Sequence, residues 1–179
     1  MPLPIRNGYR TPATVGPDRL AAACAAHFLA GEMNGGDPAP ALVIDAGTAI
    51  TYDLIDDTGT FLGGNISPGI ALRFQALHDH TAHLPLVQPT AEEAAKALSG
   101  IGDTTRTAII KGVVQGVKME MATFIHQTIL KHPAVFVFLT GRVPFPFDDI
   151  GKSRTFAVDF LVPKGLDIIL RYSRQANAL

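Results

Sequence analysis

One stretch, residues 41–69, constrains the fold more than any other part of the chain. It contains three runs of apolar or alternating residues, separated by Ala-Gly and Thr-Gly turn pairs: ALVIDAG, AITYDLID and FLGGNISPG. Runs of this kind bounded by turn residues are typical of strands, and connections this short join antiparallel neighbours. We therefore predict three consecutive antiparallel strands, over 41–47, 49–56 and 61–69.

Helical patterns flank these strands. Residues 16–31 are predicted to form a helix, because Pro17 suits a first turn, Asp18 is favoured near the positive end of the helix dipole and Gly31 can end it. The proline-rich residues 1–15 are expected to form an extended lead-in. Further along, the pattern predicts helices over 70–80, 91–98, 104–132 and 163–175, a buried strand over 134–141 and a weaker strand over 155–162. This order predicts an α/β protein with a mixed sheet.

The composition narrows the class of protein. A chain of 179 residues with 47% hydrophobic and 17% charged residues is expected to fold into a compact body with a substantial core. A net charge of −1 and the lack of a basic run argue against nucleic acid as a partner. We expect a cytoplasmic protein that does not enter a membrane. Its one cysteine cannot form an internal disulfide, its start lacks the apolar core of a signal peptide, and no apolar run is long enough to span a bilayer.

The aspartate in VIDAGT is a candidate for chemistry. Asp45 ends a predicted buried strand, Gly47 permits a close approach of the backbone, and Thr48 offers a hydroxyl and a backbone N–H to an anion. A corner that binds phosphate needs these features, together with a carboxylate to hold a cation. The alternative is an ordinary hairpin in which the aspartate accepts hydrogen bonds from the turn.

A second pair of charged residues stands at the start of the predicted helix 16–31. Asp18 beside Arg19 fits a general base next to a cationic substrate clamp, because the proton acceptor in phosphoryl transfer must lie near the attacking hydroxyl. The simpler interpretation is a helix N-terminal charge followed by a solvated arginine.

Both motifs belong to a longer series of segments: PLPIRNGYRTPATVGPDRLAA, VIDAGTAITYDLID, GGNISPGIALRFQALHDHTAHLPLV, TTRTAIIKGVV and VFLTG. In these segments, from about Pro2 to Tyr172, the chain resembles the type III pantothenate kinases of the acetate and sugar kinase, heat-shock protein and actin superfamily. The resemblance implies a ribonuclease H-like, actin-like ATPase fold. It also implies the ATP-dependent phosphorylation of pantothenate to 4'-phosphopantothenate, the first step of coenzyme A biosynthesis.

The resemblance also implies roles for individual residues. Asp18 matches the family's proton acceptor, within the substrate-binding stretch Gly16-Pro17-Asp18-Arg19. Tyr9 and Thr105 fall where the family contacts pantothenate. Asp45 matches a ligand of a monovalent cation (K⁺ or NH₄⁺), and Thr48 matches a contact to the phosphates of ATP, which is used with Mg²⁺.

Members of the family are built from two related halves, and the first half opens with a D-x-G-N-T phosphate loop. No segment of this sequence matches that loop. We therefore interpret residues 1–40 as the end of the first half and 41–179 as the second half of a duplicated two-domain kinase, and we expect the chain alone to be weakly active or inactive. Arg142 stands where the family usually has a glycine near the base and sugar. It is expected either to disturb adenosine binding or to point to solvent.

The family is dimeric, with active sites at the subunit interface, so the resemblance implies a homodimer. Gly112 and Gly116 lie one turn apart in the predicted helix 104–132, and glycines at this spacing suggest close packing against another backbone. This helix is therefore a candidate for pairing between subunits.

Three other interpretations are weighed against the kinase. Asp53, Asp56 and Asp57 fit a nuclease of the ribonuclease H type that holds two magnesium ions, although IDDTGT is also a good hairpin signal. A relative that binds pantothenate or a partner without catalysis is the second alternative. His78, His80 and His83 of HDHTAH suggest a metal site, but the cluster falls where the family has a helix end and a loop.

Overall fold

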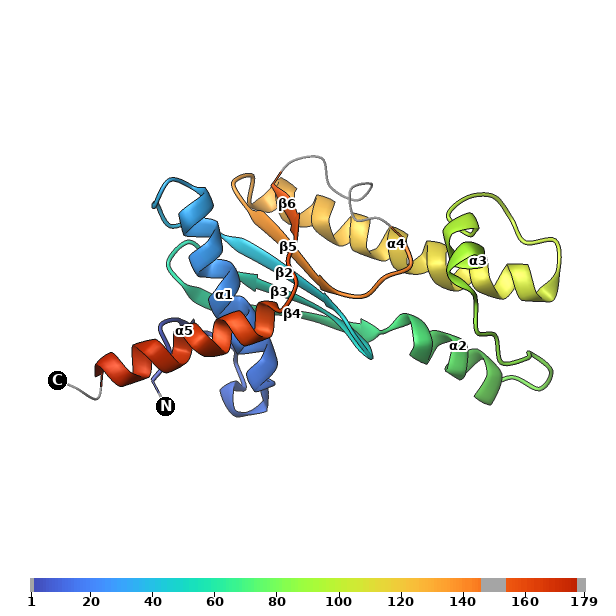
Figure 1. Ribbon diagram of the computed structural model, residues 1–179, viewed down its shortest axis with the longest axis horizontal. Helices are drawn as coiled ribbons and strands as arrows, with labels where there is room; N and C mark the ends of the chain where they lie inside the picture. The colour runs from blue at the N-terminus through green and yellow to red at the C-terminus, as the bar shows by residue number, and fades with distance from the viewer. Residues whose placement is uncertain (1, 146–153, 177–179) are drawn as a thin grey trace.

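The computed structural model describes residues 2–145 and 154–176, and this part of the chain is built around a six-stranded mixed sheet (Figure 1). The strands lie in the order β1-β4-β3-β2-β5-β6. They are β1 (Arg6–Asn7), β2 (Ala41–Ala46), β3 (Ala49–Ile55), β4 (Thr60–Pro68), β5 (Phe136–Gly141) and β6 (Thr155–Ala157). The helices are α1 (Pro17–Met33), α2 (Ile70–Asp79), α3 (Ala91–Lys96), α4 (Thr105–Lys131) and α5 (Leu161–Ala176), and Pro12–Thr14 forms a 3₁₀ turn.

The three antiparallel strands predicted over 41–69 are confirmed. β2 pairs antiparallel with β3, and β3 pairs antiparallel with β4. On its other edge β2 pairs parallel with β5, and β5 pairs parallel with β6. The sheet is therefore mixed, as predicted. Because β2 and β5 run parallel, their carboxyl ends meet at the same edge of the sheet, with Ala46 opposite Gly141.

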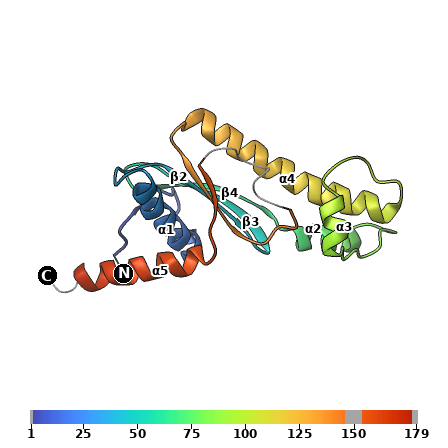
Figure 2. The same cartoon turned by 45° about the horizontal axis from the view of Figure 1, so that its top comes forward.

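Helices cover both faces of the sheet because its central strands are apolar on both faces. In β2, Leu42 and Ile44 join the core cluster that includes α4, whereas Ala41 and Val43 join the cluster that includes α1 and α5. Figures 1 and 2 both show α1 and α5 on one face and α4 on the other. The molecule is thus a three-layer α/β/α body, which places the start of α1 on one side of the sheet edge and α4 on the opposite side.

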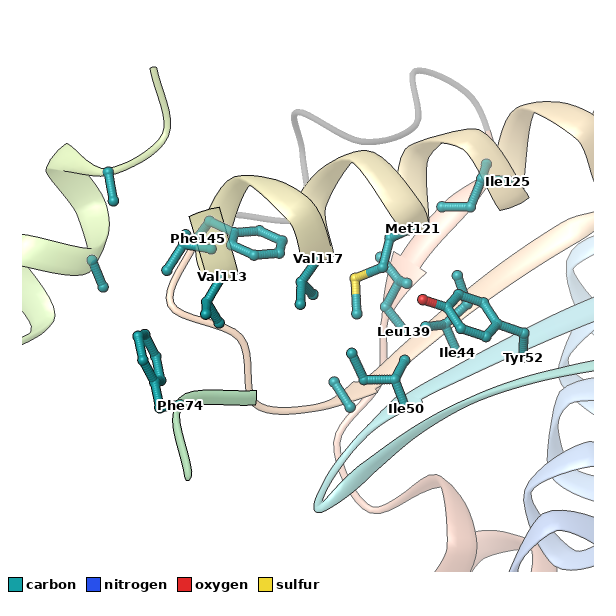
Figure 3. Close-up of a cluster of buried hydrophobic side chains, with 14 of the residues drawn as sticks. Ile44, Ile50, Tyr52, Phe74, Val113, Val117, Met121, Ile125, Leu139 and Phe145 are labelled. Atoms are coloured by element: carbon teal, nitrogen blue, oxygen red, sulfur yellow. The ribbon is translucent and has the colours of Figure 1, made fainter. Parts of the chain in front are cut away.

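α4 contributes an apolar stripe to the core. Side chains four residues apart lie on one face of a helix, and this stripe points toward the sheet (Figure 3). Its labelled members are Val113, Val117, Met121 and Ile125. Met121 lies near Ile44, Ile50, Tyr52 and Leu139 of the sheet, whereas Val113 lies beside Phe145. This packing fixes the C-terminal half of α4 over the sheet.

α2, α3 and the N-terminal end of α4, together called the arm, project beyond one end of the sheet in both ribbon views (Figures 1 and 2). A polar cluster ties the arm to the sheet at the carboxylate of Glu120 in α4. Arg73 of α2 donates to Oε2 at 2.6 Å, and the Tyr52 hydroxyl donates to Oε1 at 2.7 Å. Ser67 of β4 donates to the same Oε1. The arm is therefore anchored by charged and polar contacts where it leaves the apolar core.

The structure differs from the predictions near the two ends of the chain. The lead-in contains the short strand β1, which pairs parallel with β4 through Arg6 and Thr60. The strand predicted over 155–162 is shortened to β6, because the chain turns at Phe160, whose φ is 58°, and α5 begins at the next residue. Within the described residues, no helix combines the length and apolar character needed to span a bilayer.

Candidate active site

The corner between β2 and β3 is a tight hairpin formed by Gly47 and Thr48. The backbone N–H of Gly47 donates to the carbonyl of Ala49 at 3.0 Å, which closes the turn. The residue before α2 holds the corner from outside, since the N–H of Gly69 donates to the carbonyl of Thr48 at 2.9 Å. A Cβ atom at position 69 would overlap the carbonyl oxygens of both corner residues, so only glycine permits this approach. The predicted phosphate corner is thus rigidly placed at the sheet edge.

The start of α1 lies beside this corner. Gly16 is the N-cap of α1, Pro17 occupies its first turn and Asp18 is the acidic residue of that turn, as the sequence predicted. The guanidinium of Arg19, the next residue, points into the protein and forms a bidentate ion pair with Asp53 of β3. Its Nε lies 3.0 and 3.1 Å from the two carboxylate oxygens, and Nη2 also donates to Oδ1.

Arg19 is therefore not the solvated arginine of the simpler interpretation. It is buried, and its guanidinium carbon lies 5.8 Å from the ring centroids of both Tyr9 and Phe61. The hydrogen bond to Asp53 raises the pKa of Arg19, so the guanidinium stays charged. Burial raises the pKa of Asp53, and the Arg19 guanidinium opposes this by lowering it. This pair fixes the first turn of α1 to β3 and so determines where Asp18 stands.

A cavity of about 270 Å³ lies between the start of α1 and the corner. We call it the inner cavity, and its lining includes Asp18, Arg19, Asp45, Thr48 and Thr51. Burial raises the pKa of Asp45, and the nearby carboxylates of Asp18 and Asp53 raise it further. Because Arg19 is already paired with Asp53, the remaining carboxylates give the inner cavity a negative character that suits a bound cation.

A second hollow, of about 620 Å³, lies on the other side of the corner. We call it the outer cleft. It is lined by the corner itself, by apolar residues at the starts of α2 and α3, and by the residues that follow β5: Ala46, Gly47, Thr48, Ile70, Ala71, Pro89, Thr90, Ala91, Ala94, Gly141, Arg142, Val143 and Pro144. Thr48 lines both hollows, so the corner separates a carboxylate-rich space from a largely apolar one.

Tyr9 lies close to the start of α1, although it comes from the lead-in. Its ring packs against Phe61, with 6.1 Å between the ring centroids, and against the backbone of Gly63 in β4. It is partly exposed and stands next to the Arg19 guanidinium. The structure therefore brings Tyr9, the Gly16–Arg19 stretch, Asp45 and Thr48 to the same region.

Thr105 is not part of this region. It is the first residue of α4, after the N-cap Thr104, and it lines an apolar cavity of about 820 Å³ between α2 and α4. Figures 1 and 2 place that end of α4 at the tip of the arm, away from α1. Gly112 lines the same cavity. Apart from neighbouring residues and the backbone of α4 itself, no described atom would lie within 4 Å of a Cβ at Gly112 or Gly116. The close packing predicted for these glycines is therefore not made within the described chain.

The structure also shows what the acidic residues of IDDTGT do. The Asp56 carboxylate accepts hydrogen bonds from the Thr58 hydroxyl at 2.7 Å and from the Thr60 N–H at 2.8 Å, so it caps the β3–β4 turn. Asp53 is paired with Arg19. Among the described residues, no group of three His, Cys, Asp or Glu side chains is arranged to hold a metal ion. These contacts favour turn chemistry over a two-magnesium nuclease.

Sequence reasoning missed the partnership of Asp53 with Arg19. The two residues are 34 positions apart, so no local motif joins them. A signal was nevertheless present, because an aspartate inside the apolar strand AITYDLI is expected to be buried, and a buried carboxylate needs a counter-charge. The sequence alone does not identify which of the 15 Lys and Arg residues supplies it.

Three features together point to one class of protein: the mixed sheet, the glycine corner at the end of β2 and the acidic start of α1 beside it. They are consistent with an α/β kinase fold of the actin-like ATPase type. A family model described as "Type III pantothenate kinase" matches residues 1–127. The chain belongs to the type III pantothenate kinase family, and the resemblance inferred from its motifs is confirmed.

Individual relatives agree with this assignment. The type III pantothenate kinases of Phocaeicola vulgatus and Bacteroides fragilis are each 46% identical to the chain over 172 residues, which are 96% of the chain and 66% of the relative. That of Porphyromonas gingivalis is 40% identical over 172 residues, 96% of the chain and 67% of the relative. The chain thus spans 66% of the length of the first two relatives.

A solved structure gives a further match. It is the crystal structure of a conserved Campylobacter jejuni protein assigned to the Baf family of transcriptional activators. It matches with a TM-score of 0.52 and 20% sequence identity, covering 98% of this chain and 71% of the other. At this identity the match supports the fold alone.

Proposed function

We propose that the chain acts in the ATP-dependent phosphorylation of pantothenate to 4'-phosphopantothenate, the first step of coenzyme A biosynthesis, in the cytoplasm where ATP is available. The observation that carries this proposal is the inner cavity, where Asp18, Asp45 and Thr48 meet beside the glycine corner. A proton acceptor, a cation ligand and a phosphate contact are the parts that phosphoryl transfer requires, because the protein mainly positions the reactants and stabilises charge.

In this proposal each residue has a separate task. Asp18 accepts the proton of the pantothenate hydroxyl as its oxygen attacks the γ-phosphorus of ATP. A new P–O bond forms, the bond between the γ-phosphorus and the bridging oxygen breaks, and ADP leaves. The hydroxyl and the backbone N–H of Thr48 donate to phosphate oxygens, whereas Tyr9 and the stretch Gly16–Arg19 hold pantothenate. Arg19 acts there mainly by positioning α1, since its guanidinium is engaged by Asp53.

A monovalent cation, K⁺ or NH₄⁺, fits the inner cavity in this scheme. The residue proposed to hold it is Asp45, whose carboxylate is crowded by Asp18 and Asp53 and would be relieved by a positive ion. Mg²⁺ is expected to enter with ATP, held largely by phosphate oxygens and water. Both ions would neutralise charge near the transferring phosphoryl group.

The proposal also covers the two halves of the kinase and its oligomeric state. We interpret residues 41–179 as the second half of a duplicated kinase and residues 1–40 as the end of the first half, and we expect the 179-residue chain alone to turn over slowly or not at all. We also propose a homodimer with active sites at its interface. It is supported by the position of Thr105 at the tip of the arm, where it cannot meet Asp18 of the same chain (Figure 1).

The Asp18→Asn variant tests the proposed reaction. The protein is incubated with ATP, pantothenate, Mg²⁺ and K⁺, and phosphopantothenate is measured by mass spectrometry. We expect Asp18→Asn to lower any turnover by about 10²- to 10⁴-fold, because a general base contributes on that order. Pantothenate binding measured by calorimetry should persist, since the amide retains the size and polarity of the carboxylate.

The matched control is Asp57→Asn, which removes an exposed aspartate from the β3–β4 turn. It should leave turnover unchanged. Wild-type turnover by the Asp18→Asn protein would contradict the role of Asp18. If the wild-type chain turned over as fast as a full-length relative, the expectation of weak activity would be wrong, while the proposed reaction would stand.

A further inference from the structure

The outer cleft contains a charged residue whose function is not explained by the steps above. Arg142 is the only charged residue among the described residues that line this cleft. It is exposed, and within the described part of the chain its guanidinium forms no hydrogen bond or ion pair. The guanidiniums of Arg19, Arg73 and Arg106, in contrast, are all bound to carboxylates. Arg142 therefore offers its donors to the cleft or to solvent.

The strand register places Arg142 next to the phosphate corner. Gly141 at the end of β5 is opposite Ala46 at the end of β2, and the N–H of Arg142 donates to the carbonyl of Ala46 at 2.9 Å. Gly141 has a φ of 86° and lies so close to Ala46 that an added Cβ would overlap its backbone. The backbone of Arg142 is thus held beside Gly47, the first residue of the corner.

The rest of the outer cleft suggests how a nucleotide would lie in it. Ile70, Ala71, Ala91, Ala94 and Val143 form apolar walls that suit a flat aromatic base. The hydroxyl and backbone N–H of Thr48, beside Gly47, form its polar end. A nucleotide with its phosphates at this polar end would bring them within reach of a long side chain starting at Arg142.

We propose that Arg142 is a nucleotide-binding residue that contacts the phosphates of ATP and does not obstruct the adenosine. This inference rests on the proposed kinase function. Guanidinium groups form charge-assisted, often bidentate hydrogen bonds to phosphate, and Arg142 has all its side-chain donors available for them. The contact would add a positive charge to a corner whose other phosphate ligands are neutral.

The experiment measures the binding of ATP, ADP and adenosine to the 179-residue chain by calorimetry, with Mg²⁺ present and at low and moderate salt. The variants are Arg142→Ala, which removes the charge, and Arg142→Lys, which keeps it. The control is Arg174→Ala, which removes one exposed charge from α5. We expect Arg142→Ala to weaken ATP and ADP binding about three- to tenfold and to leave adenosine unchanged, because only the phosphates lose a partner.

The other variants sharpen this expectation. Arg142→Lys should lose less ATP affinity than Arg142→Ala, and Arg174→Ala should resemble the wild type. The ATP affinity of the wild type should fall more steeply with salt than that of Arg142→Ala, because an exposed charge contact is screened.

Three results would overturn the inference. Equal ATP affinity of the wild type and Arg142→Ala would mean that the side chain points to solvent. Tighter adenosine and ATP binding by Arg142→Ala would mean that Arg142 obstructs the cleft. Both of these outcomes leave the proposed kinase function intact, since ATP still binds. Failure of the wild type to bind ATP at all would overturn the inference together with the proposed nucleotide site.

Discussion

At the scale of single residues, the site combines a carboxylate that is paired with a cation, Asp53, with one that lies beside other carboxylates, Asp45. Asp53 is fully buried and Arg19 is 8% exposed, and each finds its counter-charge in the other. Removing one partner of such a pair leaves an uncompensated buried charge, which typically destabilises a protein by about 3–5 kcal/mol. Asp45 has no such partner within residues 2–145 and 154–176, and burial and the nearby carboxylates of Asp18 and Asp53 raise its pKa. A residue that is electrostatically unfavourable in the unliganded protein is what a cation site needs.

The Asp45→Asn variant should therefore gain stability and lose its response to cations. The pKa of Asp45 is raised in the folded protein, so its ionised form is disfavoured there relative to the unfolded chain. Its contribution to the free energy of unfolding then falls as the pH rises through the ordinary pKa of aspartate toward the raised value. At neutral pH we expect Asp45→Asn to raise Tm by roughly 2–4 °C, which corresponds to about 1 kcal/mol for a chain of this size.

Thermal scanning at several pH values checks this prediction. The difference in Tm between Asp45→Asn and the wild type should vanish in acid, where Asp45 is protonated. It should narrow when K⁺ is added at neutral pH, because a bound cation stabilises only the wild type. Asp57→Asn serves as the control for a general loss of negative charge. A lower Tm for Asp45→Asn at neutral pH would show that the carboxylate is stabilising without a cation.

At the scale of elements, the contact between α1 and α5 depends on one small residue. Gly165 of α5 lies so close to α1 that an added Cβ would overlap the carbonyl oxygen of Ala21. Around it, α1 presents alanines and Cys24, all buried. The two helices therefore pack backbone against backbone over one face of the sheet, and α1 in turn carries Asp18 to the corner.

Two glycine-to-alanine variants separate this packing from helix propensity. Gly165→Ala should destabilise the protein by about 2 kcal/mol or more, because the helices must move apart. In Gly116→Ala, the new Cβ meets no described atom within 4 Å beyond the backbone of α4 itself. This variant should gain about 0.5–1 kcal/mol from the better helix former. Urea unfolding measures both. Equal effects of the two substitutions would mean that α5 does not pack on α1 as described.

The elements that sequence analysis predicted well carry a strong local signal. The run 41–69 alternates between apolar stretches and turn residues, and α4 has a capping box at Thr104 and an apolar stripe, so local chemistry and tertiary packing agree. β1 was missed because a strand of two residues has no period, and it exists only through its pairing with β4. β6 was overextended because FAVDFLV is apolar in character while Phe160 adopts a left-handed turn.

The candidate site was predictable to a similar degree. The motifs identified Asp18, Asp45 and Thr48, and the fold brings these three residues together. The Arg19 ion pair and the approach of Gly69 to the corner could not be predicted, since both depend on contacts between segments that are distant in sequence.

At the scale of the whole molecule, the arm separates Thr105 from the site to which family resemblance assigns it. The proposed homodimer resolves this separation if Thr105 of one copy meets Asp18 of the other. Mixing two inactive variants tests the idea. A dimer of one Asp18→Asn chain and one Thr105→Ala chain would contain one site with both native residues, so activity should reappear, at about a quarter of the wild-type level in a statistical mixture.

Phosphopantothenate formation is the measurement, followed at high protein concentration over long incubations so that slow turnover is detected. The control mixes the Asp18→Asn variant with the double variant Asp18→Asn/Asp57→Asn. No chain in this mixture carries a native Asp18. A mixture as inactive as its components, in a sample that light scattering shows to be dimeric, would mean that each site is built within one chain. A strict monomer would remove the proposed interface altogether.

The burial of Cys24 has a practical consequence for such measurements. It is the single thiol of the chain, it lies in the α1 face of the core, and burial raises its pKa to about 12. Thiol reagents react with the thiolate, so the native protein should remain unlabelled under conditions that modify an exposed cysteine. Ile101, which is 90% exposed in the loop before α4, can then be replaced by cysteine to give one dye attachment point on each arm. Energy transfer between differently labelled copies would report how two arms approach each other in solution.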